Sequence, residues 1–420
     1  MSPYPNVILY EEQSNFMQAS PLLQEFHPGP ALLILAWVVV WGGIGGVVTP
    51  RIYRRRDLDA SKATLYGTIA GAGLGPILLI ILWTKTPELD WRWNVIPSLT
   101  ALGLLYWAFA TYHPANLCVT SGTYVISQVS NGILIGILYG VIAIGLTLIF
   151  SILGIVSFAH GQFYMLGGYA AFFTISQTMG AGLHPIIGLL MAGLITFVIG
   201  VVFEYTLLRP MHLGKVERPG EYAILLTFGL AFFLEYSALA ILGANPRKVD
   251  PFFNLGNITI GAITLPPSRV IAAGIGLLIL VILLWFLNYT WLGKALRAVS
   301  QDKQAAAVVG INPLNMNTLA FGLGAMLAGL SGAALVQVLA WVPNIGALAS
   351  TRSFVVIVLG GMGSLPGAMI GGIVIGIVES LGVGCFPDVS RALAYQQVFG
   401  MIIFAVVLLL KPTGLFGREL

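Results

Sequence analysis

The chain has 420 residues, of which 57% are hydrophobic and only 9% are charged, and its mean hydropathy is +0.91. Soluble domains carry about 25% charged residues, so this composition excludes an ordinary soluble protein. Apolar runs of about 20 residues recur along the chain, and each is long enough to cross a bilayer as a helix. They lack the period-two alternation of a membrane β-barrel. The sequence therefore predicts an all-α, polytopic transmembrane bundle.

The net charge of +4 does not indicate a nucleic-acid partner, because the basic residues are spread over short loops. Such loops are where positive-inside sorting places Lys and Arg. Cys118 and Cys385 form no CxxC site and are expected to form no disulfide framework. The first 28 residues lack the basic start and apolar core of a signal peptide.

The first 123 residues are expected to form an N-terminal extension with about three transmembrane helices, ahead of a core domain at 124–420. Its apolar segments are 31–48, 64–83 and 95–110. The stretch RIYRRRDLDASK (51–62) lies between the first two and is the strongest basic cluster of the chain. It predicts a cytoplasmic loop, the alternative being a site for anionic lipid head groups.

The core begins with a long apolar run at 124–175. Further apolar segments follow at 185–207, 222–242, 270–287, 318–340, 354–381 and 398–410. Basic loops at 209–218 and 294–303 are expected in the cytoplasm. If 51–56 also lies inside, the first run must cross three times, which is tight because each span needs about 20 residues. Half-spanning helices would satisfy this count; alternatively, the extension breaks the rule.

A polar, glycine-rich interruption divides that first run, with the sequence GIVSFAHGQFYMLGGY (154–169). It places Ser157, His160, Gln162 and Tyr164 at membrane depth. Polar groups there are costly unless they pair or face a watery path. A broken, glycine-rich segment at this depth is typical of a transport route. The alternative is a satisfied helix-packing patch.

A second interruption, GGMGSLPG (360–367), is expected to break 354–381 into two shorter helices near Pro366. Glu379 follows it inside the apolar segment, and Glu235 lies in an earlier one. Either carboxylate is expected to line a route or to hold a structural hydrogen bond. Glu204 has Arg209 five residues later and is expected at the membrane interface.

Catalytic motifs are absent from the sequence. It contains no GxxxxGK[ST], no HExxH and no GxSxG, and its five histidines are scattered. We therefore expect no catalytic residues, no metal site and no cofactor, and a chain that is not an enzyme.

The loop WLGKALRAVSQDKQAAAVVGINP (291–313) predicts a short helix at 303–309. Asp302 can cap its start, and Gly310 can end it in a left-handed turn. Ala305, Ala306 and Val309 would form a small apolar face that fits a groove on another protein. An ordinary amphipathic connector is the alternative.

Three stretches together resemble the permease subunit of branched-chain amino acid ABC importers: SFAHGQFYMLGGY, GKALRAVSQDKQAAAVVGIN and GGMGSLPGAMIGGIVIGIVES, in this order. The resemblance covers about 124–415, including the closing KPTGLFGR. It implies a multi-pass permease in the plasma (bacterial inner) membrane. It also implies a second, related permease, two cytoplasmic ATP-binding subunits that hydrolyse ATP, and an extracytoplasmic substrate-binding protein.

The resemblance also assigns residues. Arg297, Asp302, Ala306 and Gly310 match the loop that docks on the ATP-binding subunit. Phe158 to Gly161 match the core motif near the translocation path, and Ser364 to Gly367 match the second break. Many family members have Asn where this chain has Ser157. The expected translocation path comprises Ser157, His160, Gln162, Tyr164, Pro366 and Glu379.

The leading hypothesis is ATP-driven import of an aliphatic amino acid, with this chain as half of the channel. A close variant imports urea or short amides. An ion-coupled secondary transporter would need a titratable site within one chain, for which Glu235 and Glu379 are candidates. A membrane scaffold would gain nothing from the polar breaks.

Overall fold

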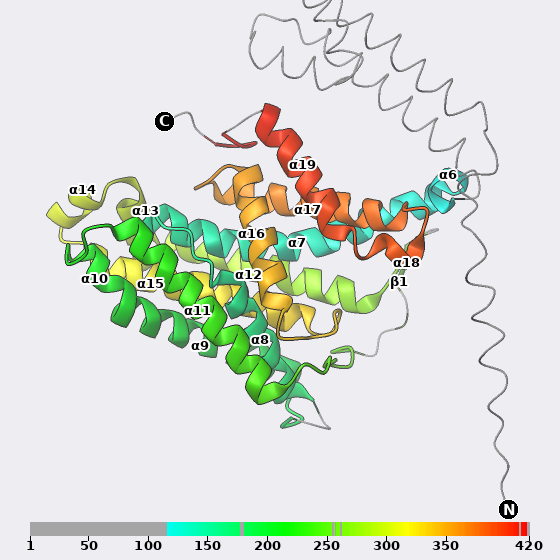
Figure 1. Cartoon of the computed structure of the whole chain (residues 1–420), viewed down its shortest axis with the longest axis horizontal. Helices are drawn as coiled ribbons and strands as arrows, with labels where there is room; N and C mark the ends of the chain where they lie inside the picture. Colours follow the sequence, from blue (N-terminus) through cyan, green and yellow to red (C-terminus); the bar gives the residue numbers. More distant parts are fainter. Residues whose placement is uncertain are drawn as a thin grey trace, which may run out of the picture. The chain divides into compact units, whose positions relative to one another are not determined.

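The apolar runs of the core form long helices in the computed structural model (Figure 1). The structure describes residues 116–176, 180–253, 256, 258–260, 263–410 and 413–417. They belong to a unit that spans Tyr112–Leu420. The three expected N-terminal helices and the basic cluster at 51–62 lie outside the described residues.

Within the described part of the chain, six helices are long and apolar enough to cross a membrane, which confirms a helical membrane core. They are Gly122–Leu153 (α7), Pro185–His212 (α9, η3 and α10), Pro219–Leu242 (α11), Pro267–Tyr289 (α12), Pro313–Leu335 (α15) and Leu365–Gly384 (α17). Proline stands in the first turn of five of these, α9, α11, α12, α15 and α17, where its missing N–H costs nothing.

Shorter elements connect or cross the spans. The helices are α6 (Leu117–Thr120), α8 (His160–Ile175), α13 (Trp291–Gln301), α14 (Lys303–Val308), α16 (Ile345–Gly360), α18 (Val389–Ala392) and α19 (Gln396–Leu410). The second span divides into α9 (Pro185–Phe203), the π-helix η3 (Glu204–Leu208) and α10 (Arg209–His212). Strands β1 (Ile258–Ile260) and β2 (Ile263–Leu265) pair as an antiparallel hairpin, with Ile258 opposite Leu265.

The first long run forms two helices, α7 and α8, rather than the three crossings that a cytoplasmic 51–56 would require. α7 continues for 32 residues without interruption and ends at Gly154, which has φ +78°. At 1.5 Å per residue it is about 48 Å long, more than the thickness of the bilayer core. The polar stretch then supplies a single break before α8, which has 16 residues. The alternative was that the N-terminal extension does not follow the positive-inside rule. It concerns residues that the structure does not describe.

The second break is confirmed. α16 ends at Gly360 and α17 begins at Leu365, and the connection contains Gly361 and Gly363 at φ +99° and +88°. Glycine adopts this left-handed region without steric cost. α16, like α8, has only 16 residues. The two glycine-rich breaks therefore each border a helix too short for a full span.

α7 and α17 lie side by side along a seam of glycines (Figure 1). A Cβ on Gly132 would lie 2.6 Å from the Cα of Ile377, and one on Gly136 would lie 2.7 Å from that of Ile373. Real Cβ atoms do not come so close, so only glycine permits this approach. Residue numbers increase along α7 while those of the contacting residues in α17 decrease, so the two helices are antiparallel.

This seam corrects the expectation for the cysteines. Cys118 and Cys385 form a disulfide across a separation of 267 residues. The antiparallel pairing brings the start of α7 to the end of α17, a proximity that no local spacing reveals. Asn116 also holds these two helix ends together, because its Nδ2 donates to the carbonyl oxygen of Cys385 (3.2 Å). Disulfides persist in oxidising compartments, so we expect this end of the core to face away from the cytoplasm.

Candidate translocation site

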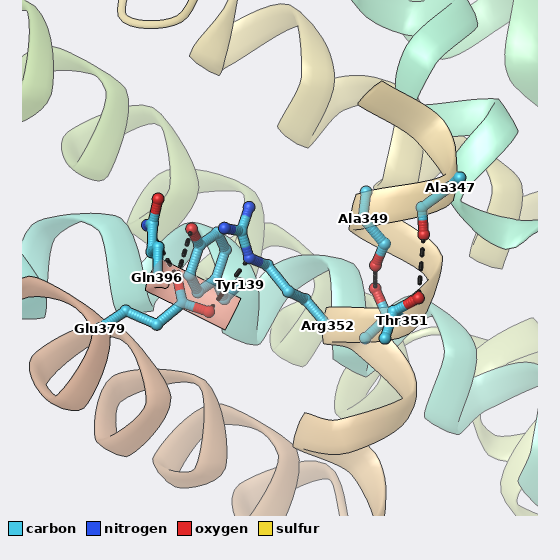
Figure 2. Close-up of polar contacts among 8 residues, drawn as sticks. Tyr139, Ala347, Ala349, Thr351, Arg352, Glu379 and Gln396 are labelled. Carbon is cyan, nitrogen blue, oxygen red and sulfur yellow. Dashed lines mark hydrogen bonds and ion pairs between the residues drawn. The ribbon is translucent and has the colours of Figure 1, made fainter. Parts of the chain in front are cut away.

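Four polar side chains from four helices meet inside the bundle (Figure 2). Glu379 on α17 is the centre of this polar cluster. Its Oε1 accepts from Nε of Arg352 on α16 (3.1 Å). Its Oε2 accepts from the hydroxyl of Tyr139 on α7 (3.2 Å) and from Nε2 of Gln396 on α19 (2.9 Å). Each member is thus held by another helix, and the carboxylate charge is compensated.

Tyr139 and Glu379 of the polar cluster are buried, and Arg352 and Gln396 are partly buried. Side-chain exposure is 18% for Arg352 and 3% for Glu379. The guanidinium of Arg352 also lies over the ring of Tyr139, 5.2 Å from its centroid. Charged groups at membrane depth are costly, and they are found where they pair or line a path. The polar cluster therefore has the character of a functional site.

Two small cavities adjoin this ion pair, and Arg352 lines both. The first has about 20 Å³ open to the centre of a water molecule and is lined by Tyr139, Ile142, Tyr164, Leu339, Ile345, Ala349, Arg352 and Ser353. The second has about 10 Å³ and is lined by Thr351, Arg352, Val355, Ile375, Glu379, Gln397, Gly400 and Met401. Each has room for about one water. Arg352 is therefore shared by the two cavities, whereas Glu379 lines only the second.

α16 is positioned by a close crossing with α8. The backbone N–H of Gly161 donates to Oγ of Ser350 (2.9 Å), and this hydroxyl donates to the carbonyl oxygen of Phe158 (3.1 Å). A Cβ on Gly161 would overlap with the carbonyl oxygen of Gly346. The FAHG break and the start of α16 thus form one packed unit, which sets the position of Arg352 two residues after Ser350.

Of the residues expected along the path, Tyr164 lines the first cavity and Glu379 lines the second. Tyr164 also packs on Trp341, with 4.9 Å between ring centroids. Pro366 is exposed in the first turn of α17 and lines neither cavity. The structure therefore brings two of the six predicted residues to the cavities.

The other three support the break. His160 is fully buried, and its Nε2 lies 2.9 Å from the carbonyl oxygen of Ile142 on α7. A carbonyl only accepts, so Nε2 carries the proton. Gln162 is buried and donates from Nε2 to Oε2 of Glu235 on α11 (3.0 Å). Ser157 is also buried. His160 and Gln162 hold α8 against α7 and α11, as the packing-patch alternative describes in part. The Oγ of Ser157, the Nδ1 of His160 and the Oε1 of Gln162 are nevertheless buried without a hydrogen-bond partner among the described residues.

Sequence reasoning missed Arg352, Tyr139 and Gln396. The signal for Arg352 was present, because it is the only charged residue of α16 and stands in the apolar stretch STRSFVVIVLGG. The rule applied to the intramembrane acids holds equally for arginine. Tyr139 and Gln396 carry no such signal. Glu204 is fully buried and accepts a hydrogen bond from the hydroxyl of Thr318 on α15, and its expected place at the membrane interface stays a prediction.

The second predicted site, the loop around Asp302, has the expected local structure. Oδ1 of Asp302 accepts from the backbone N–H groups of Gln304 (2.8 Å) and Ala305 (3.0 Å), which caps α14. Gly310 follows at φ +89°. Arg297 on α13 donates from Nη1 to Oδ1 of Asn288 (3.0 Å). α14 ends at Val308, one residue earlier than expected.

The apolar surface of α14 differs from the expected one. Ala306 is only 3% exposed, whereas Val308 and Val309 are 87% and 74% exposed. Ala306 turns toward its own chain because the N–H of Ile311 returns to its carbonyl oxygen, which folds the helix end back. Ala305 and Val309 are exposed as expected, and Val308 adds to this outward apolar surface, so only Ala306 departs from the expectation. α14 lies with α10 and α13 at the end of the core opposite α6 and α18 (Figure 1).

Comparison with known proteins agrees with this architecture. The family model described as "Branched-chain amino acid transport system / permease component" matches residues 128–410. The permease protein BraD of Pseudomonas aeruginosa is 32% identical over 304 residues, which cover 70% of this chain and 96% of BraD. LivH of Escherichia coli is 31% identical over 302 residues, with the same two shares. Both are named high-affinity branched-chain amino acid transport system permease proteins.

A more distant relative is LivM of Salmonella typhimurium, another high-affinity branched-chain amino acid permease protein. It is 24% identical over 257 residues, which cover 54% of this chain and 57% of LivM. No solved structure matches the chain. The matched residues include both glycine-rich breaks, the polar cluster and the loop around Asp302. The chain therefore belongs to the branched-chain amino acid transport permease family, as a multi-pass membrane transport subunit of an ABC system and not an enzyme.

Proposed function

We propose that this chain forms one half of the membrane channel of an ATP-driven importer of branched-chain amino acids. The observation that carries the proposal is the Arg352–Glu379 pair, whose arginine lines two cavities, inside a core that matches the family over 128–410. Ile142, Leu339 and Ile345 supply apolar walls to the first cavity. Such a lining suits an aliphatic side chain, and the ion pair suits a zwitterion.

The path is proposed to run past Tyr164 and Glu379, which line the cavities. His160 and Gln162 contribute by holding the FAHG break in place, and the buried Ser157 lies within that break. Pro366 contributes by starting α17 after the second break. In this arrangement the two short helices, α8 and α16, are the elements that move during alternating access.

Partners are proposed for both ends of the core. The exposed Val308 and Val309 suit docking of a cytoplasmic ATP-binding subunit, one for each of two permeases. The shape of that docking loop would depend on Arg297, Asp302, Ala306 and Gly310. Ala306 would contribute by packing against its own chain, because its side chain is buried. A second, related permease is supported by the similarity to LivM as well as LivH. An extracytoplasmic binding protein would deliver substrate at the disulfide end.

The N-terminal 123 residues are proposed to be an addition to the permease core at 124–420. The matched part covers 96% of BraD and LivH but only 70% of this chain, which supports an added segment. The family match likewise begins at residue 128.

The alternatives have weaker support. Urea and short amides carry no net or separated charges and would gain little from a buried ion pair or from aliphatic walls. Ion coupling needs a carboxylate free to bind a cation, but Glu379 accepts from Arg352, Tyr139 and Gln396.

Uptake of labelled leucine and labelled urea tests the proposal, in cells with and without this chain and after an uncoupler has collapsed the proton gradient with ATP maintained. Leucine uptake that needs the chain and survives the uncoupler supports it. Urea uptake that needs the chain and survives the uncoupler would show that the substrate is urea rather than a branched-chain amino acid. Uptake that the uncoupler abolishes would contradict ATP-driven import.

A further inference from the structure

The guanidinium of Arg352 has donors to spare. It gives only Nε to Glu379, and its two Nη atoms donate in no hydrogen bond among the described residues. Glu379, by contrast, receives three donors on its two oxygens. A carboxylate binds two parallel N–H groups of a guanidinium in a forked geometry. The polar cluster can therefore bind an anion through the two Nη atoms of Arg352.

The surroundings of Arg352 select which anion fits. The first cavity adds three aliphatic walls, from Ile142, Leu339 and Ile345, and two polar side chains, Tyr164 and Ser353. A free α-amino acid with an aliphatic side chain presents a carboxylate beside a hydrocarbon group, which matches this lining. Its ammonium group would be balanced by Glu379, on the other side of Arg352.

The cavities as they stand are too small for such a ligand, since each admits about one water. The structure is thus closed at this level, and binding of such a ligand requires Arg352 on α16 and Glu379 on α17 to move apart. Glycines at φ +99° and +88° connect the two helices and provide a flexible joint. Separation would break the Arg352–Glu379 contact and leave two charges unpaired in a poorly solvated place, which is strongly unfavourable.

A zwitterion can compensate both charges at once. We propose that Arg352 binds the carboxylate of the passing amino acid, and that the Arg352–Glu379 pair is a gate that opens only when the substrate replaces each partner. This rests on the proposed function, since it names the recognition point within that path. In the closed state Glu379 holds Arg352, and Tyr139 and Gln396 orient Glu379; in the open state Glu379 faces the ammonium group of the substrate.

Neutral substitutions of the two residues, singly and together, test the gate. The complete importer is reconstituted in proteoliposomes with its binding protein, and leucine uptake is measured together with ATP hydrolysis. We expect Arg352→Gln to lower uptake by about tenfold or more, because a charge-assisted forked contact is lost. ATP hydrolysis should continue, so more ATP is consumed for each leucine moved. Glu379→Gln should lower uptake only a few fold.

The double variant Arg352→Gln/Glu379→Gln separates recognition from architecture. If the pair only stabilises the fold, removing both charges restores uptake, because no buried charge is left unpaired. If Arg352 binds the substrate, uptake stays as low as in Arg352→Gln. Restoration to the wild-type rate would overturn the gate.

Two further variants keep the test decisive. Arg352→Lys keeps the charge but loses the fork; we expect intermediate uptake, and a wild-type rate would overturn forked recognition even if the Gln variants fail to assemble. Arg391→Gln breaks an exposed ion pair with Asp388 (3.2 Å) and should match the wild type. A wild-type importer without ATP-dependent leucine uptake would defeat the proposed function itself, independently of the gate.

Discussion

Gly168 on α8 lies against the indole of Trp341, so closely that a Cβ at position 168 would overlap with the ring. Trp341 is fully buried, and its Nε1 donates to the carbonyl oxygen of Met165 on the same helix (3.0 Å). Backbone pairing with Arg247 holds the other side of this residue (2.9 and 2.7 Å). The indole therefore fills a space that the absence of a side chain at position 168 leaves open.

Gly168→Ala is expected to destabilise the chain by about 1–3 kcal/mol, because the added methyl group forces the indole out of its place. We expect this loss of stability even though alanine has a higher helix propensity than glycine. Thermal unfolding of the purified chain, with size-exclusion chromatography to detect the chain that stays folded, measures this loss of stability. Gly229→Ala on α11 is the matched control, since its added Cβ meets no atom within 4 Å. Equal effects of both substitutions would contradict the packing argument.

Gly136→Leu is expected to reduce the fraction of chains that contain the Cys118–Cys385 disulfide. The new side chain would meet the backbone of Ile373, so α7 and α17 would separate and the two cysteines with them. Mobility on a gel without reductant measures the disulfide fraction. Gly274→Leu on α12 is the control, because a Cβ there has open space. A full disulfide yield in Gly136→Leu would show that the seam does not align the cysteines.

The disulfide and α14 are expected to be accessible from opposite sides of the membrane. In intact cells, an impermeant reductant followed by an impermeant maleimide should label Cys118 and Cys385, because their end of the core faces an oxidising compartment. Ala305→Cys on exposed α14, in a chain with both native cysteines changed to serine, should be labelled only after permeabilisation. Labelling of Ala305→Cys in intact cells would reverse the proposed orientation.

Val308→Asp combined with Val309→Asp is expected to lower leucine uptake by about tenfold or more. Two charges would replace the exposed apolar surface of α14 and weaken docking of the ATP-binding subunit. Copurification of that subunit with the permease is the direct measurement. Gln304→Asp adds a charge to the same helix at an exposed polar position and should leave docking intact. Unchanged copurification in the valine variant would place the docking surface elsewhere.

Asp302→Ala is expected to destabilise α14 by about 1 kcal/mol, because two backbone N–H groups lose their acceptor. Uptake should fall a few fold, since a helix of six residues depends strongly on its cap. Asp302→Ser retains a capping oxygen and should preserve most of the activity. Hydrogen exchange of the Gln304 and Ala305 amides measures the cap directly; equal exchange in the Ala and Ser variants would contradict it.

Much of this protein was predictable from its sequence because the determining features are local. Hydrophobic length predicts the spans, and glycine and proline predict the breaks at 154–159 and 361–364. Asp302 and Gly310 predict the start and the end of α14, because capping acts over a few neighbouring residues. Tyr164 and Glu379 were identified because polar groups in apolar surroundings are conspicuous.

The sequence by itself thus determined a helical membrane core, its two breaks and the capped helix, since all of these follow from interactions between residues close in the chain. Only the tertiary structure decided that Arg352 meets Glu379, that Cys118 meets Cys385, and that Ala306 turns inward. Each of these depends on which helix faces which. That choice is made by packing over the whole bundle, above all along the glycine seam of α7 and α17.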